Sequence, residues 1–110
     1  LTNQQGRDSN NINNPCDCND MQYSVYEDMI NLADGRMKSD IEKNEKDNTL
    51  LISLYQENKD ISNICEKMYQ KLGEEDFYRN HSNCKYPNIR KLRIQLSKLG
   101  IAGVNESKKE

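Results

Sequence analysis

The sequence predicts an all-α fold, a compact bundle of three to four helices joined by two disulfides. Apolar residues recur at spacings of three and four along most of the chain, and no alternating pattern typical of a β-strand competes with them. The chain has 110 residues, of which only 34% are hydrophobic. Because so small a core is hard to stabilise by burial alone, we expect the four cysteines to form stabilising cross-links.

The amino-terminal segment has the composition of a flexible arm. Seven of its first fifteen residues are Asn or Gln, and such a segment buries too little apolar surface to offset its ordering entropy. We therefore expect a flexible arm over residues 1–15, a helical disulfide-linked domain over residues 16–103 and a polar tail over residues 104–110.

The first predicted helix starts at Asn19 or Asp20, either of which is a good helix cap. Its apolar positions continue with helical spacing over residues 25–41. Gly35 lies within this stripe, where it favours a bend or a break. The run over residues 42–47 contains no apolar residue, so we expect it to form the turn to the next helix.

The second predicted helix is capped by Asp47 or Asn48, and its apolar stripe ends at Leu72. Gly73 follows directly, at the position where a left-handed C-terminal cap is expected. The sequence also predicts a short third helix over residues 74–78.

The last predicted helix begins near Pro87, a residue that the first turn of a helix tolerates. Gly100 ends this helix, and its apolar residues at helical spacing are Ile89, Leu92, Leu96 and Leu99. With this stripe turned inward, Arg90, Lys91 and Lys98 are expected to project mostly into solvent.

Charge is distributed unevenly along the chain. Residues 17–76 include fifteen acidic and seven basic residues, whereas residues 77–105 include six basic residues and no acidic one. Charge of one sign on one face raises association rates and selects partners. We therefore predict that the last helix is an electropositive surface that binds an acidic protein or a sulfated glycan through Arg90, Lys91, Arg93 and Lys98. The alternative is a solvated helix face without a binding role.

Several classes of function are disfavoured by composition. A net charge of -2 argues against a general nucleic-acid binder, and the apolar stripes are expected to be used in the core rather than at a membrane. The longest apolar run, residues 50–52, is far too short to span a bilayer. His81 is the only histidine, and no catalytic motif accompanies it. We therefore expect no enzymatic activity and no cofactor.

Two disulfides are predicted from four cysteines, which are Cys16, Cys18, Cys65 and Cys84. Cys16 and Cys18 are too close in sequence for an unstrained mutual bridge, so each is expected to pair with one of the other two, and both such pairings remain open. Each disulfide contributes on the order of 4 kcal/mol at most in the chain-entropy model. Because disulfides persist in oxidising compartments, we expect a secreted, extracellular protein. Asn80 and Asn105 begin glycosylation sequons, which fit this location.

Several motifs together suggest a family. They are Pro15-Cys16-Asp17-Cys18, then Tyr23-x-x-Tyr26-Glu27, then Cys65, and finally Cys84 ahead of a basic last helix. This arrangement resembles the small four-cysteine salivary proteins of blood-feeding sand flies, in particular the anticomplement proteins of New World sand flies. The resemblance implies an all-helical disulfide-linked fold, secretion in saliva, and inhibition of the classical complement pathway by stoichiometric binding of a host plasma protein. We expect the protein to act as a monomer.

Three other interpretations remain open. A carrier of the odorant-binding type would hold a biogenic amine or a lipid in an apolar cavity between its helices. A structural zinc site would use Cys16, Cys18, His81 and Cys84 as ligands. The origin of the chain is also open, because a parasite with an Asn- and Lys-rich proteome would produce a secreted protein of similar composition.

Overall fold

The computed structural model describes residues 7–79, 84–86 and 88–101, and within these residues it contains five α-helices, one short 3₁₀-helix and no β-strand. The prediction of an all-α, disulfide-linked fold is confirmed. The elements are η1 (Ser9–Asn11), α1 (Pro15–Ala33), α2 (Lys38–Glu42), α3 (Glu45–Leu72), α4 (Glu74–Arg79) and α5 (Ile89–Lys98). Three of these helices are long, whereas α2 and α4 have only five and six residues.

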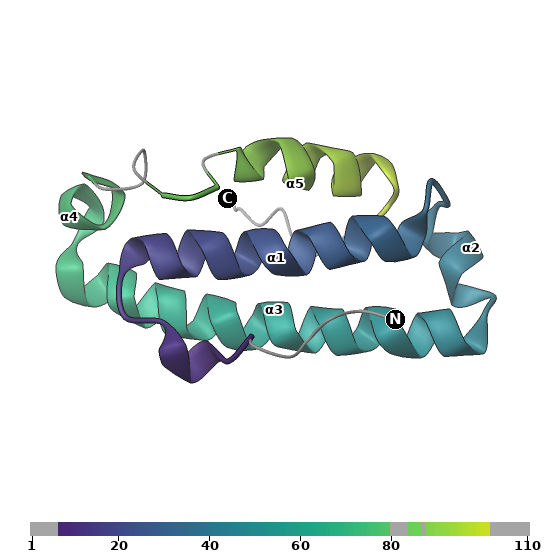
Figure 1. Cartoon of the computed structure of the whole chain (residues 1–110), viewed down its shortest axis with the longest axis horizontal. Coiled ribbons are helices and arrows are strands. Elements are labelled where there is room, and N and C mark those ends of the chain that lie inside the picture. The colour runs from purple at the N-terminus through teal and green to yellow at the C-terminus, as the bar shows by residue number, and fades with distance from the viewer. Residues whose placement is uncertain (1–6, 80–83, 87, 102–110) are drawn as a thin grey trace.

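The long helices lie side by side (Figure 1). Helices α1 and α3 form an antiparallel hairpin, and α5 packs along α1 on the side away from α3 in this view. Helix α2 joins the hairpin at one end, and α4 follows α3 at the other end. Helix α1 therefore occupies the middle of the bundle and contacts both other long helices.

Helix α1 begins four residues before the first predicted cap, at Pro15. Asn14 is the N-cap, and its side chain accepts a 2.9 Å hydrogen bond from the backbone N–H of Asp17. Proline suits the first helical position because a backbone N–H at that position would have no partner within the helix, so its absence costs no hydrogen bond. The predicted break near Gly35 is confirmed, since Asp34 and Gly35 both have positive φ and separate α1 from α2.

Helix α3 also begins earlier than predicted. Asn44 is its N-cap and accepts a 3.0 Å hydrogen bond from the backbone N–H of Asp47, which therefore lies inside the first turn. The helix then continues unbroken for 28 residues to Leu72. Gly73 ends it with φ 87° and ψ 161°, so its φ is positive as expected but its ψ lies outside the left-handed helical region.

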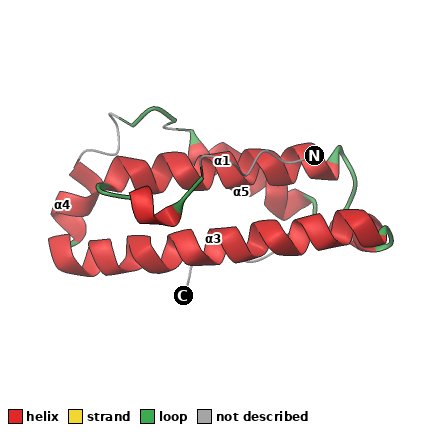
Figure 2. Cartoon of the chain, turned by 60° about the horizontal axis from the view of Figure 1, so that its bottom comes forward, coloured by secondary structure: helices red, strands yellow, loops and turns green. Residues whose placement is uncertain are grey.

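The described part of the predicted arm lies against the hairpin. Residues 7–14 pass along the seam between α1 and α3, with η1 between the two helices in Figure 2. Ile12 is only 7% exposed and belongs to the core, and Arg7 hydrogen-bonds to both helices. The predicted tail over residues 104–110, together with Asn80, His81 and Asn105, lies outside the described residues.

The core forms around α1, where this helix packs against α3 and against α5. Its largest fully buried side chains come from α1, α2, α3 and α5 and from the residue after Gly100, and they are Val25, Tyr26, Met29, Ile41, Leu51, Leu54, Leu96 and Ile101. Among the residues that the structure describes, no helix is both long enough and apolar enough to cross a membrane.

Candidate functional site

The two disulfides are Cys16–Cys84 and Cys18–Cys65, with Cα–Cα distances of 5.0 Å and 5.8 Å. This is one of the two pairings that the sequence left open. Residues two apart on a helix point about 200° apart, so Cys16 and Cys18 project from nearly opposite sides of α1. Cys18 consequently reaches α3, whereas Cys16 reaches the segment that precedes α5. Both bonds use sulfur atoms that the alternative zinc site requires as thiolates.

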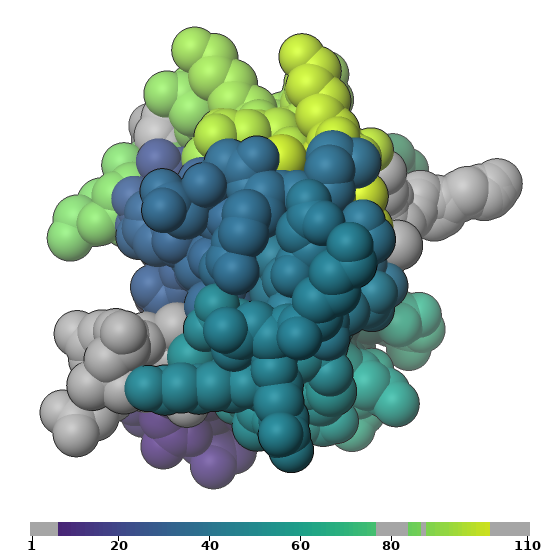
Figure 3. All heavy atoms as spheres, turned by 90° about the vertical axis from the view of Figure 1, so that its right-hand side faces the viewer, coloured from purple at the N-terminus to yellow at the C-terminus, as the bar shows by residue number. Residues whose placement is uncertain are grey.

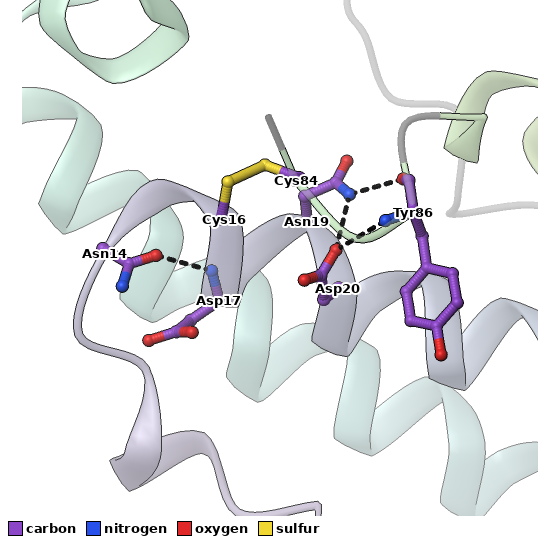
Figure 4. The surroundings of a disulfide bond; sticks show 7 residues. All are labelled: Asn14, Cys16, Asp17, Asn19, Asp20, Cys84 and Tyr86. Carbon is purple, nitrogen blue, oxygen red and sulfur yellow. Dashed lines mark hydrogen bonds between the residues drawn. A yellow bond between two sulfur atoms is a disulfide. The ribbon is translucent and has the colours of Figure 1, made fainter. Parts of the chain in front are cut away.

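The segment leading into α5 is fixed to α1 by a group of contacts that we call the clasp (Figure 4). Figure 4 shows five of its residues, which are Cys16, Asn19 and Asp20 on α1 together with Cys84 and Tyr86. Its sixth residue is Tyr23 on α1, which contacts Tyr86.

Hydrogen bonds and ring stacking hold Tyr86 within the clasp. Asn19 Nδ2 donates to the Tyr86 carbonyl oxygen at 2.7 Å, and the Tyr86 N–H donates to Asp20 Oδ1 at 3.1 Å. The Tyr23 and Tyr86 rings stack with centroids 4.4 Å apart and planes 7° apart. The sequence suggested Asn19 and Asp20 as helix caps. In the structure both lie inside α1, and their side chains make tertiary contacts with Tyr86.

The other end of α5 is also held in place. The Lys38 N–H at the start of α2 donates to the Leu99 carbonyl oxygen at 2.7 Å. Ile101, just beyond Gly100, is fully buried. Because both ends of α5 are attached and its apolar stripe is packed on the core, the orientation of its outer surface is fixed.

The predicted binding residues lie on and beside the outer surface of α5. Arg90, Lys91 and Lys98 are exposed, and Arg93 is half-buried at the edge of the helix. At about 100° per residue, positions 90, 94 and 98 follow one line along the helix and position 91 lies beside that line. Side chains of α5, green to yellow in Figure 3, stand out from the top of the molecule.

Sequence reasoning missed one residue of this surface, Ile94. Its side chain is 51% exposed and lies one helical turn from both Arg90 and Lys98. The signal was present in the sequence, because Ile94 is an apolar residue outside the inward stripe. We use the name cationic face for the surface formed by Arg90, Lys91, Ile94 and Lys98.

The basic side chains of the cationic face have no acidic partner among the described residues. Among all the described residues, the basic side chains that form ion pairs within 4.0 Å are those of Arg7, Arg36, Lys38 and Lys43. The positive charge on α5 is therefore not neutralised by contacts within the described bundle, and it is available for a partner.

A surface pocket of about 440 Å³ lies at the opposite end of the hairpin from the clasp, between the end of α1 and the start of α3. Charged and polar side chains predominate in its lining, which is formed by Asp28, Asn31, Leu32, Asp34, Arg36, Lys46, Asp47 and Leu50. This lining differs from the enclosed apolar cavity that a carrier of the odorant-binding type requires. Within the described part of the chain, no cluster of three or more metal-binding side chains occurs.

Comparisons with protein-family models, with curated proteins and with solved structures find no match to this chain. The fold and the site therefore define its class by themselves: a small, disulfide-linked helical protein with a fixed cationic helix surface.

Proposed function

We propose that this protein is secreted and acts as a non-enzymatic, protein-binding inhibitor of a host defence cascade, in particular the classical complement pathway. The observation that carries the proposal is the cationic face of α5, which is fixed at both ends and lacks acidic partners among the described residues. A rigid surface of this kind inhibits by occlusion, since it covers a docking site on its partner and requires no chemical step.

Two considerations support an extracellular location and the choice of the complement pathway. Disulfides are typical of extracellular proteins, and the two disulfides here attach α1 to α3 and to the segment that precedes α5. The cysteine spacing and the basic last helix resemble the anticomplement salivary proteins of sand flies, and this resemblance is the reason for choosing the classical pathway over other plasma cascades.

Lysis of antibody-coated erythrocytes in serum tests the proposal. The wild-type chain is expected to block lysis, and the variant Arg90→Glu/Lys91→Glu/Lys98→Glu is expected to raise the half-inhibitory concentration at least about a hundredfold, because like-charge contacts across an interface cost several kcal/mol.

The matched control is Lys59→Glu/Lys67→Glu/Lys71→Glu, which changes net charge equally at three exposed positions of α3. It should inhibit lysis as well as the wild type does, and both variants should keep the circular-dichroism spectrum of the wild type. Equal inhibition by the two variants would exclude α5 as the binding surface, and absence of inhibition by the wild type would exclude the proposed function.

A further inference from the structure

We infer that the partner element bound by the cationic face is an acidic protein segment containing an aliphatic side chain, rather than a sulfated glycan, and that Ile94 is the apolar centre of the contact. This inference rests on the proposed function, since it specifies what the same face binds. It adds the chemical class of the partner and a residue that determines specificity.

Ile94 is the reason for choosing a protein. It lies on the side of α5 opposite the buried Ile89 and Leu96, so the bundle does not use it in its core. An exposed isoleucine alone carries little meaning, because Ile52 on α3 is 58% exposed. The two differ in their neighbours one turn away, which are Asn48 and Gln56 for Ile52 but Arg90 and Lys98 for Ile94.

An apolar centre with a charged rim is the usual anatomy of a protein-binding surface. The line from Arg90 to Lys98 is about 12 Å long, which is the length of two helical turns or of a short extended segment. Carboxylates of such a segment would neutralise the basic side chains, and Arg90 is suited to bidentate contacts with them. A sulfated glycan would neutralise the same charges but has no branched aliphatic side chain with which to cover Ile94.

Selection from a phage-displayed library of random short peptides on the immobilised full chain tests the inference. Peptides that bind the wild type and fail to bind Arg90→Glu/Lys91→Glu/Lys98→Glu are expected to combine Asp or Glu with Leu, Ile or Val. Synthetic versions are then titrated against Ile94→Ala and, as a matched control, Ile52→Ala. Ile94→Ala should weaken binding about tenfold, equivalent to ~1.4 kcal/mol. Ile52→Ala should leave the affinity unchanged.

Three outcomes would overturn the inference. Peptides could bind Ile94→Ala as tightly as the wild type, or the selected peptides could lack acidic residues. The selection could also yield no binder while heparin retains the wild type and releases the triple Glu variant, which would assign the face to a glycan.

The erythrocyte assay separates this inference from the proposed function. Tight binding of acidic peptides through Ile94 without inhibition of lysis would contradict the function and leave the inference standing. Inhibition that is lost in the triple Glu variant but fully kept in Ile94→Ala would contradict the inference and leave the function standing.

Discussion

The buried side chain of Arg7 attaches the amino-terminal segment to both helices of the hairpin. Its guanidinium, with a side chain only 6% exposed, donates to Asp28 Oδ2 on α1 and to Glu57 Oε1 on α3, both at 2.7 Å. Burial by itself would lower the pKa of Arg7, but the hydrogen bonds to Glu57 and Asp28 outweigh this effect and raise the pKa above its ordinary value.

The direction of this shift fixes how the contact depends on pH. Because the pKa of Arg7 is higher in the folded than in the unfolded chain, its protonated side chain stabilises the fold. This stabilisation is fully present below the unfolded-state pKa and is lost only as pH rises through the folded-state pKa. Both values of Arg7 lie far above neutral pH, so its guanidinium stays charged over the whole range in which proteins are normally handled.

Replacing Arg7 is expected to destabilise the bundle. Arg7→Met keeps an apolar stem but leaves two largely buried carboxylates without their partner, which should lower the free energy of unfolding by about 2 kcal/mol. Urea denaturation measures this change. The control Lys43→Met removes an exposed ion pair with Asp40 and should change stability by less than ~0.5 kcal/mol. Equal effects of the two substitutions would show that the Arg7 contacts do not stabilise the fold.

At the level of helices, apolar spacing was sufficient to predict α1, α3 and α5 but not the residues at which they start, and it did not predict η1. Asn and Asp are so frequent in this chain that several residues qualify as caps. The structure uses Asn14 and Asn44, whereas the sequence suggested residues closer to the apolar stripes. Whether a residue caps a helix depends on the backbone conformation of that one residue. Hydrophobic periodicity carries no information about that conformation.

The candidate site was predictable to the extent that it is local. The basic residues and the inward stripe of α5 follow from the sequence because a helix fixes which positions share a face. The clasp could not be predicted, since Asn19 and Tyr86 are 67 residues apart and only the tertiary fold brings them together. The disulfide pairing was undetermined for the same reason.

Breaking the clasp should release α5 specifically. In Cys16→Ser/Cys84→Ser, amide hydrogen exchange over residues 89–98 is expected to become much faster, because the segment before α5 loses its covalent attachment, while α1 and α3 stay protected. Exchange followed by mass spectrometry measures this directly.

The comparison variant for the clasp is Cys18→Ser/Cys65→Ser, which removes the α1–α3 bond and should accelerate exchange in those helices first. If α5 in Cys16→Ser/Cys84→Ser were as well protected from exchange as in the wild type, the disulfide would not be needed to hold it. The Lys38–Leu99 hydrogen bond and the apolar stripe would then be sufficient.

At the scale of the whole molecule, the two disulfides fix the relative positions of the acidic and the basic parts of the chain. Cys18–Cys65 joins α1 to α3, and Cys16–Cys84 attaches the segment preceding α5 to the same helix, so α1 links the three long helices. The acidic residues are concentrated between positions 17 and 76, and the basic excess lies in the part that the clasp fixes to α1. Fixing that part gives the molecule a permanent charge asymmetry, which favours oriented encounters with an acidic partner.

The pairing of the cysteines tests this arrangement most directly. Digestion of the unreduced chain with an endoproteinase that cuts before aspartate separates Cys16 from Cys18, because Asp17 lies between them. Mass spectrometry of the linked fragments should then find Cys16 joined to Cys84 and Cys18 joined to Cys65, with no thiol open to alkylation. Free thiols, or Cys16 joined to Cys65, would contradict the attachment of α5 on which the proposed binding surface depends.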